Sequence, residues 1–334
     1  TTSREHTAVK IAPGYELGTL HVLDASRAVG VVGKLLSENG REDFIATNTT
    51  LQDELREKHY SKRKAKPLLP IAKVRALATQ IDWRAEDIPQ PEFTGVRSED
   101  DFPLETLVEF IDWSPFFHAW ELQGRYPKIF DDATVGDKAK ELFDDAKELL
   151  DRIVGEKLFT AKCAYGFFPA NRIGDDVELF TDDTRTKRLA KFHFLRQQND
   201  KASGENHSLA DFIAPGETGL ADHLGAFAVT AGHGVEELAK SFEADNDDYN
   251  AIMAKALGDR LAEAFAECLH ARARREWGYG ADESLSSDEL IREKYRGIRP
   301  AAGYPACPDH TEKRLLWELL DAEKHTGIRL TESC

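Results

Sequence analysis

The sequence predicts an α+β fold in which an antiparallel sheet is flanked by long helices. In four segments between Thr160 and Gly232 the hydrophobic pattern shortens to strand periodicity; these are residues 161–168, 177–181, 188–195 and 225–230. Only eight residues, 169–176, join the first two segments, too few for the helical crossover that a parallel pair needs. Amphipathic patterns of helical period lie on either side of this region, which favours α+β over a parallel α/β sheet.

Length and composition limit the function classes. The chain has 334 residues, a length typical of about two domains, and its 41% hydrophobic content indicates a globular protein. The formal net charge of −16 disfavours partners such as nucleic acid or an anionic membrane surface. The sequence has no apolar run of about 18 residues and no apolar core of a signal peptide at its start, so we expect no membrane span and a cytoplasmic location.

The cysteines indicate neither a disulfide framework nor a thiolate metal site. Cys163, Cys268, Cys307 and Cys334 are far apart and form no CxxC pair. Widely separated cysteines of this kind are typical of proteins in a reducing compartment. We therefore expect no disulfide and no tightly bound metal in this chain.

The first 60 residues predict one strand and two helices. Residues 17–24 have strand character, and residues 24–26 can cap a helix over 27–36, which Asn39-Gly40 ends. A polar helix follows over residues 41–59. One strand and a helix cannot make a core, so this part is interpreted as the trailing end of another domain. The basic, proline-containing segment 61–70 is interpreted as a solvated linker rather than as a nucleic-acid site.

The second domain begins near Ile71. Pro89, Pro91 and Pro103 predict loops, and residues 138–157 predict an amphipathic helix. After the four strands, residues 235–277 predict a long helical region whose longer part is capped by Asp247 or Asp248, with a buried stripe of Ile252, Ala256, Leu257, Leu261, Ala264, Phe265 and Leu269. Ser286 and Glu289 are spaced as a capping box, and a last helix is expected over residues 312–324, ended by Gly327.

Several common catalytic motifs are missing. The sequence contains no GxGxxG after a strand, no GxxxxGK[ST] phosphate loop, no GxSxG and no HExxH. The eleven histidines are scattered and are interpreted as core or surface residues. Serine hydrolase, P-loop and HExxH metalloprotease chemistry are therefore disfavoured.

Residues 299–310 form the first candidate site. Three prolines, a glycine and a tyrosine follow Arg299 and predict a stiff loop, against which a ligand would be ordered at low entropic cost. The Arg299 guanidinium is a planar fork suited to a carboxylate or phosphate. The alternative is an irregular connector with an ordinary surface arginine, which composition alone favours. Cys307 and His310 are two candidate ligands and make no metal site.

Two acidic residues are further candidates. Asp112, set between Ile111 and Trp113, is either the cap of the following turn or a ligand for a cation. Glu263 lies beside the predicted buried stripe, where a glutamate is usually a solvated flank.

The segments that carry these candidates resemble the C-terminal part of the cobalamin-dependent methionine synthase family. The resemblance covers nearly the whole chain, and the Arg-Pro-x-x-Gly-Tyr-Pro-x-Cys-Pro loop is its most specific block. The matching segments are residues 111–117 (IDWSPFF), 167–175 (FFPANRIGD), 195–198 (LRQQ), 226–230 (AFAVT), 247–253 (DDYNAIM), 261–267 (LAEAFAE) and 299–313.

The resemblance implies a fold and a division into domains. Residues 1–60 would be the C-terminal end of an α/β cobalamin-binding domain, in which Ala25 and Ser26 belong to a segment that lines the corrinoid. Residues 61–70 would be a linker. Residues 71–334 would be a C-shaped reactivation domain with a twisted antiparallel sheet and long helices, truncated at its C-terminus because a tyrosine-bearing segment of the family is missing.

The resemblance also implies a function. The reactivation domain binds S-adenosylmethionine, whose methyl group restores methylcobalamin after the cobalt has oxidised, with flavodoxin or methionine synthase reductase as electron donor. The implied ligand-contacting positions are Asp112, Glu263, Arg299 and Tyr304, with Glu293 near the site. Asp112 suits the ammonium group of the ligand and Arg299 suits its carboxylate.

Other parts of the family are missing from this sequence. It has no homocysteine or folate module, no cysteine set for the family's zinc and no Asp-x-His-x-x-Gly motif for the lower cobalt ligand. We therefore expect the chain to be inactive as a methyltransferase by itself. The alternative function is a non-catalytic module that binds S-adenosylmethionine and docks a cobalamin protein or its reductase. The presence of the histidine motif in the parent polypeptide would favour the enzyme.

Overall fold

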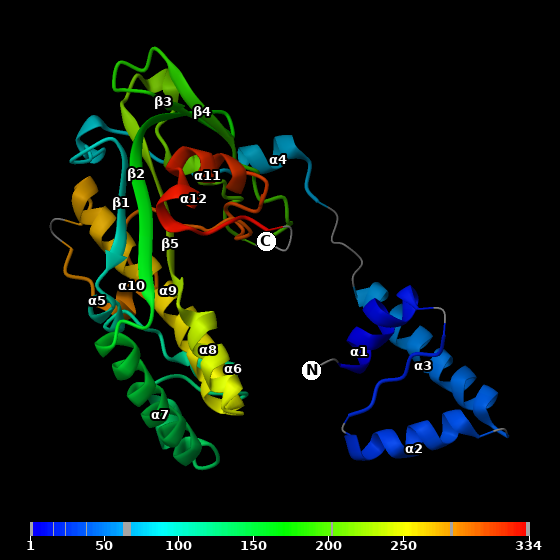
Figure 1. Ribbon diagram of the computed structural model, residues 1–334. Coiled ribbons are helices and arrows are strands. Elements are labelled where there is room, and N and C mark those ends of the chain that lie inside the picture. Colours follow the sequence, from blue (N-terminus) through cyan, green and yellow to red (C-terminus); the bar gives the residue numbers. More distant parts are fainter. Residues whose placement is uncertain are drawn as a thin grey trace. The chain divides into compact units, whose positions relative to one another are not determined.

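The computed structural model describes residues 3–15, 17–23, 25–37, 39–62, 68–201, 203–280 and 283–331. The chain divides into two compact units (Figure 1). The first comprises Thr1–Leu69 with Asn199–Lys201, and the second comprises Pro70–Gln198 and Ala202–Cys334.

The first unit is helical. It contains α1 (Arg4–His6), a π-helix (Thr7–Ile11), a 3₁₀ turn (Ala12–Gly14), α2 (Ala25–Leu36) and α3 (Arg41–Lys62). The two helices predicted here are confirmed. The strand predicted over residues 17–24 is wrong for the described part, residues 17–23, because this stretch pairs with no strand and bends at Leu17 and Leu23. Instead, the Thr19 carbonyl accepts hydrogen bonds from the side-chain amides of Asn48 at 3.0 Å and Gln52 at 2.7 Å.

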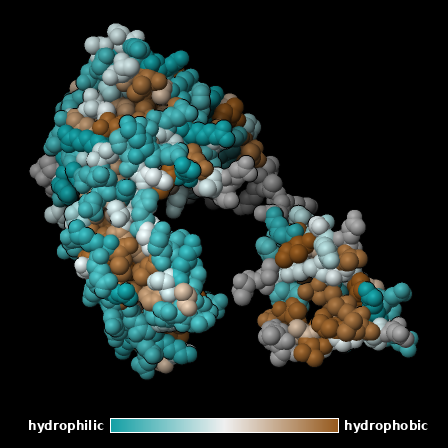
Figure 2. All heavy atoms as spheres, viewed as in Figure 1, coloured by the Kyte–Doolittle hydropathy of each residue, from teal (hydrophilic) through white to brown (hydrophobic). Residues whose placement is uncertain are grey.

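The α2 helix exposes apolar side chains. Val29 and Leu36 are 76% and 78% exposed, and Val32 is also exposed. Figure 2 shows apolar side chains gathered on this unit.

The second unit combines five strands with helices. In chain order these elements are α4 (Ile71–Ala76), a 3₁₀ turn (Ala85–Asp87), β1 (Gly95–Phe102), α5 (Leu104–Val108), α6 (Ser114–Ala119), a 3₁₀ turn (Lys128–Asp131), α7 (Gly136–Gly155), β2 (Thr160–Ile173), β3 (Asp176–Phe180), β4 (Arg188–His193), 3₁₀ turns (Leu209–Phe212 and Gly216–Thr218), β5 (Asp222–His233), α8 (Val235–Ala244), α9 (Asp248–Trp277), α10 (Ser287–Ile291), α11 (Lys313–Leu320) and α12 (Ala322–Thr326). The predicted α+β class is confirmed.

The long strand β2 is the centre of an antiparallel sheet. β1 and then β3 pair along one edge of β2, β5 pairs along the other edge, and β4 pairs with β3. The predicted antiparallel pairing of the first two strands is confirmed. Their connection is shorter than expected, because β2 continues to Ile173 and only Gly174 and Asp175 separate it from β3.

Strand β1 is an element that the sequence did not predict. Its sequence, GVRSEDDF, is polar and lies between prolines, which favoured a loop. It nevertheless pairs with β2, with Gly95 opposite Phe167 and Glu99 opposite Cys163. A Cβ atom on Gly166 would lie 2.3 Å from the Gly95 carbonyl oxygen, so glycine allows the two strands to approach here.

The two faces of the sheet pack against different helices (Figure 1). Cys163 and Tyr165 of β2 join a core with α5, α6, α7 and α9. Ala164 and Phe168 point the other way, into a second core with α11 and α12. This alternation follows from the two-residue period of a strand.

The predicted helices of the second unit are confirmed with three adjustments. The region 235–277 divides into α8 and α9, and Asp247 caps α9 by accepting the Asn250 N–H at 3.0 Å. The prediction that Ile252 of α9 is buried is wrong, because this residue is 53% exposed. The last helix divides into α11 and α12 at Asp321, which has a left-handed φ of 47°.

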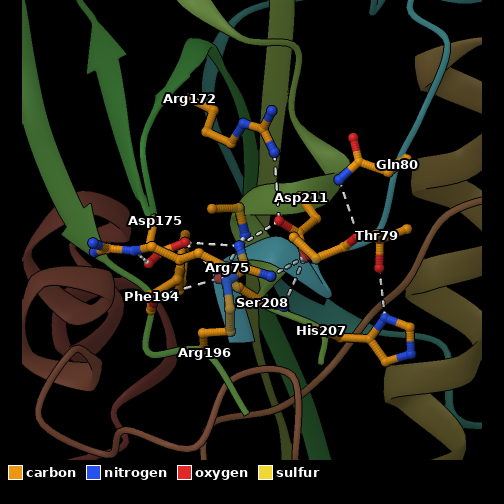
Figure 3. Close-up of polar contacts among 12 residues, drawn as sticks. Arg75, Thr79, Gln80, Arg172, Asp175, Phe194, Arg196, His207, Ser208 and Asp211 are labelled. Atoms are coloured by element: carbon orange, nitrogen blue, oxygen red, sulfur yellow. Dashed lines mark hydrogen bonds and ion pairs between the residues drawn. The ribbon is translucent and has the colours of Figure 1, made fainter. Parts of the chain in front are cut away.

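A buried ion-pair network ties the start of the second unit to the sheet (Figure 3). Arg196, almost fully buried, donates to both carboxylate oxygens of Asp211, at 2.5 and 2.6 Å, and to Asp175 at 2.7 Å. Arg75 of α4 donates to the other oxygen of Asp175 at 2.8 Å. Asp175 therefore links α4 to Arg196 through the β2–β3 turn.

Candidate functional site

A cavity of about 810 Å³ in the second unit lies between α9, β5 and residues 291–317. It is lined by side chains from both faces of the sheet, such as Phe227 on one face and Leu224 on the other. Among the described residues, β5 pairs with β2 on one side and has no strand on its other side. The cavity therefore follows the outer edge of β5.

The loop over residues 299–310 folds into a tight turn at the cavity. The Gly303 N–H donates to the Cys307 carbonyl at 2.8 Å, and the Cys307 N–H donates to the Tyr304 carbonyl at 2.9 Å. Gly303 has a φ of 100°, and a Cβ atom there would lie 2.6 Å from Nε2 of His310. The left-handed φ favours glycine here, and a larger residue would also displace the His310 ring. The turn, together with the prolines on either side, fixes the backbone after Arg299.

Arg299 pairs with Glu267 of α9. One Nη2–Oε1 contact joins the two side chains, which are 25% and 19% exposed. Within the described part of the chain, Nε of Arg299 and Oε2 of Glu267 are both buried and have no hydrogen-bond partner. The pair thus leaves one buried donor and one buried acceptor unsatisfied, although buried polar atoms are nearly always hydrogen-bonded.

Three further cavity residues hold buried nitrogen atoms without a partner among the described residues. These are Nδ1 of His270, Nε1 of Trp277 and Nδ1 of His223. Burial, with the nearby positive charges of Arg299 and Arg274, lowers the pKa of His270 to about 3, so its imidazole is neutral. The cavity wall therefore contains a neutral histidine as well as the Glu267–Arg299 pair.

Two other arginines at the cavity already have partners. Arg274 pairs with Glu283 and donates from Nη1 to the Arg296 carbonyl at 2.7 Å. Arg296 donates to the Asp87 carbonyl at 2.8 Å. Arg274 therefore holds the segment before Arg299 against α9, and Arg296 holds it against the 3₁₀ turn over Ala85–Asp87.

Three of the five site residues predicted by the resemblance line this cavity, namely Arg299, Tyr304 and Glu293. Asp112 and Glu263 are outside its lining. Asp112 precedes Trp113, the N-cap residue of α6, and accepts the N–H of Ser114, the first residue of that helix, at 2.9 Å. This contact is close to its alternative interpretation as a cap. Glu263 is 66% exposed at its side chain and pairs with Arg260 at 2.8 Å, as expected of a solvated flank. A ligand-binding role for these two residues stays a prediction.

The residues predicted to line the corrinoid lie in the first unit. Ala25 and Ser26 begin α2, and their side chains lie outside the described ones. Their role stays a prediction.

The sequence reasoning missed Glu267, His270 and Trp277 as cavity residues. A signal was present: with Arg274, they recur at intervals of three to four residues, which places them on one face of a helix. A stripe of polar and aromatic side chains on a helix that also has a buried apolar stripe indicates a second environment, here the cavity.

Neither a metal cluster nor a membrane span is found in the described ranges. They contain no group of three or more histidine, cysteine or acidic side chains placed to hold a metal ion. Cys163, Cys268 and Cys307 are buried free thiols, and Cys334 lies outside the described residues. Over the same ranges, every helix is too short or too polar to cross a membrane.

Comparisons with known proteins agree with this architecture. The family model described as the activation domain of vitamin B12 dependent methionine synthase matches residues 103–334. The chain is similar to a solved structure described as the MetH reactivation domain bound to AdoHcy, with 52% sequence identity and a TM-score of 0.75. The match covers 80% of this chain and 82% of that one.

Proposed function

Because the chain belongs to the family of vitamin B12-dependent methionine synthase activation domains, we propose that its second unit binds S-adenosylmethionine in the cavity beside β5. The similar structure was solved with AdoHcy, the demethylated product of that ligand, which supports the proposal. The bound ligand would donate the methyl group that restores methylcobalamin, so that the parent methionine synthase resumes methyl transfer to homocysteine.

The observation that carries the proposal is the place of Arg299 at the cavity wall, where its side chain is 25% exposed. S-adenosylmethionine carries a carboxylate, and the planar guanidinium group of Arg299 is suited to it. Tyr304 and Glu293 line the same cavity and are proposed to contact or flank the ligand. The apolar wall formed by side chains such as Leu224 and Phe227 would exclude water around the ligand.

The described residues would orient the ligand for methyl transfer and need not act as acids or bases. Transfer of a methyl group from a sulfonium needs alignment with its acceptor and no general base. Cobalamin, when bound, supplies a strongly nucleophilic cobalt, and the preceding domain in cis would hold most of it. The first unit is proposed to be the end of that domain, residues 61–70 the linker, and Ala25 and Ser26 corrinoid neighbours. Zinc would belong only to the homocysteine module.

The proposed partners follow from the same chemistry. Reactivation of oxidised cobalt consumes one electron, so we propose flavodoxin or methionine synthase reductase as the donor. A module that binds S-adenosylmethionine and only docks these proteins would use the same cavity.

Calorimetric titration with S-adenosylhomocysteine tests the binding site. Arg299→Ala should weaken binding by about ten- to a hundredfold or more, because a hydrogen bond to a charged group contributes ~1.5–3 kcal/mol. Arg299→Lys should recover part of the affinity, since lysine keeps the charge and loses the fork.

A control separates ligand binding from folding. Arg188 forms an exposed pair with Glu178 at 2.8 Å, away from the cavity lining, so Arg188→Ala should bind like the parent. Equal affinity of Arg299→Ala and the parent, with both proteins folded by circular dichroism, would refute the assignment.

A further inference from the structure

Residues 71–86, near the start of the second unit, bury very little apolar surface. They comprise α4 and the chain after it, and all of them are described. Val74 is the only buried side chain among these residues, and it belongs to neither of the two hydrophobic cores. Ile71, Leu77 and Ile81 are exposed. Hydrophobic burial therefore contributes little to holding this segment in place.

Polar contacts attach the segment to distant parts of the second unit. Within the described ranges three such contacts are found, and two of them lead to consecutive residues of one loop. The Asn206 N–H donates to the Leu77 carbonyl at 2.8 Å. Thr79 Oγ1 shares a hydrogen bond with Nδ1 of His207 at 2.6 Å (Figure 3). Such bonds add little net stability, because water replaces them when a segment leaves the surface.

Arg75 makes the third contact, at the exposed end of the ion-pair network (Figure 3). It donates to Asp175 at 2.8 Å, and its side chain is 59% exposed, whereas that of Arg196 is 2% exposed. If Arg75 left, Asp175 would keep its bond from Arg196 at 2.7 Å, and Asp211 would stay paired with Arg196. The segment can therefore detach without leaving a buried charge alone.

The chain is held more firmly from Asp87 onward. The Asp87 carbonyl accepts from Arg296 at 2.8 Å, and Ile88 is buried. The Glu92 N–H then donates to the Glu276 carbonyl of α9 at 2.8 Å. The weakly held segment thus ends at a defined anchor. Segments with few buried apolar contacts open at a lower free energy than the whole domain.

We propose that residues 71–86 are a detachable strap, which leaves the surface of the second unit while the sheet stays folded, and which then lengthens the tether to the first unit. With the strap docked, residues 63–70 connect it to the end of α3 and reach no further than roughly 30 Å. With the strap released, residues 63–86 reach roughly 85 Å. The strap would thus limit how far the first unit can move. This inference does not depend on the ligand proposed for the cavity.

Native-state hydrogen exchange of the whole chain tests the release. The Asn206 amide reports it directly, because this N–H donates to the Leu77 carbonyl of the strap. It should exchange about a hundredfold or more faster than the most protected amides of the β2–β5 pairing, and its rate should hardly respond to low urea concentrations, since local release exposes little surface. The same rate and the same urea dependence for both sets of amides would mean that the segment opens only on global unfolding, which overturns the proposal.

Variants distinguish release of the strap from motion of the loop that holds Asn206. Val74→Asp places a charge at the only buried position of the strap, so the Asn206 amide should lose its protection while the β2–β5 amides keep theirs. Arg75→Ala should speed Asn206 exchange about two- to fivefold, as expected for a partly exposed ion pair. Arg84→Ala is the matched control and should leave the rate unchanged, because Arg84 pairs with Asp82 inside the strap at 2.7 Å. Loss of protection throughout the sheet in Val74→Asp would show that Val74 supports the fold, and would contradict the strap.

Distance measurements test the tether. Spin labels are placed at Lys58→Cys in α3 and Glu217→Cys in the second unit, both exposed positions, with Cys334→Ser to leave only buried thiols besides the labels. In double electron–electron resonance, the distribution of distances should extend further in Val74→Asp than in the parent or in Arg84→Ala. An unchanged distribution in Val74→Asp, when hydrogen exchange shows that the strap is released, would refute its role in the tether.

Discussion

Replacing Asp211 with alanine would leave Arg196 buried without its closest partner. Asp211 accepts from both terminal nitrogens of Arg196, at 2.5 and 2.6 Å, and also accepts the Ser208 N–H at 3.0 Å (Figure 3). Arg196 would keep its bonds to Asp175 and to the Asn206 carbonyl. Removing one partner of a buried pair costs ~3–5 kcal/mol of unfolding free energy, because the remaining charge stays desolvated.

The size of the effect makes it measurable. For a domain of this size, 1 kcal/mol shifts the melting temperature by about 2–4 °C, so Asp211→Ala should lower it by roughly 6–20 °C. Thermal unfolding followed by circular dichroism reports this, and urea unfolding gives the change in free energy. The double variant Arg196→Met/Asp211→Ala should recover part of the loss, since an apolar pair carries no desolvated charge.

Arg188→Ala is the control for losing a partly exposed pair, which costs no more than about 1 kcal/mol. A loss below 1 kcal/mol for Asp211→Ala, or a double variant less stable than the single one, would refute the reasoning that buried charge dominates here.

Two further predictions concern the same end of the second unit. Burial opposes the charge of Asp175, but hydrogen bonds from Arg75 and Arg196 hold the pKa of that carboxyl below its ordinary value. The stabilisation by charged Asp175 should therefore be present near neutral pH and decline as the pH falls below about 4. In urea unfolding, the free energies of unfolding of Asp175→Asn and of the parent should converge at low pH. A difference between them that does not change with pH would contradict this. Trypsin should cut first within residues 61–70, whose lysines and prolines supply no core; first cleavage inside residues 140–270 would contradict the proposed linker.

The strands and helices with strong hydrophobic patterns were predictable from the sequence, whereas β1 was not. Its side chains are mostly polar because they lie at the surface, and the pairing that makes it a strand is with β2, nearly 60 residues later. The segment 17–23 fails in the opposite way: it has apolar strand character without a strand to pair with. The local hydrophobic pattern indicates the propensity of a segment to be a strand. Whether the segment is one also depends on a pairing partner far away in the sequence.

The candidate site was predictable in part for a similar reason. Arg299 and Tyr304 lie in a loop whose prolines and glycine are visible in the sequence. Glu267 lines the cavity and meets Arg299 only because the fold brings α9 against that loop. Asp112 shows why residue type is insufficient, since the same carboxylate that suits an ammonium group caps a helix.

The position of the cavity along β5 has a consequence for biosynthesis. A ribosome delivers the five strands first, and at ~5–20 residues per second the roughly 80 residues from His233 to Trp317 follow only after about 4–16 s. During that time the outer edge of β5 and its apolar side chains, such as Leu224, lack the loop and α11 that later pack beside them. An uncovered strand edge is a template for pairing with another chain. The segment that completes the cavity therefore also ends the interval in which the edge of the nascent sheet is exposed to misassociation.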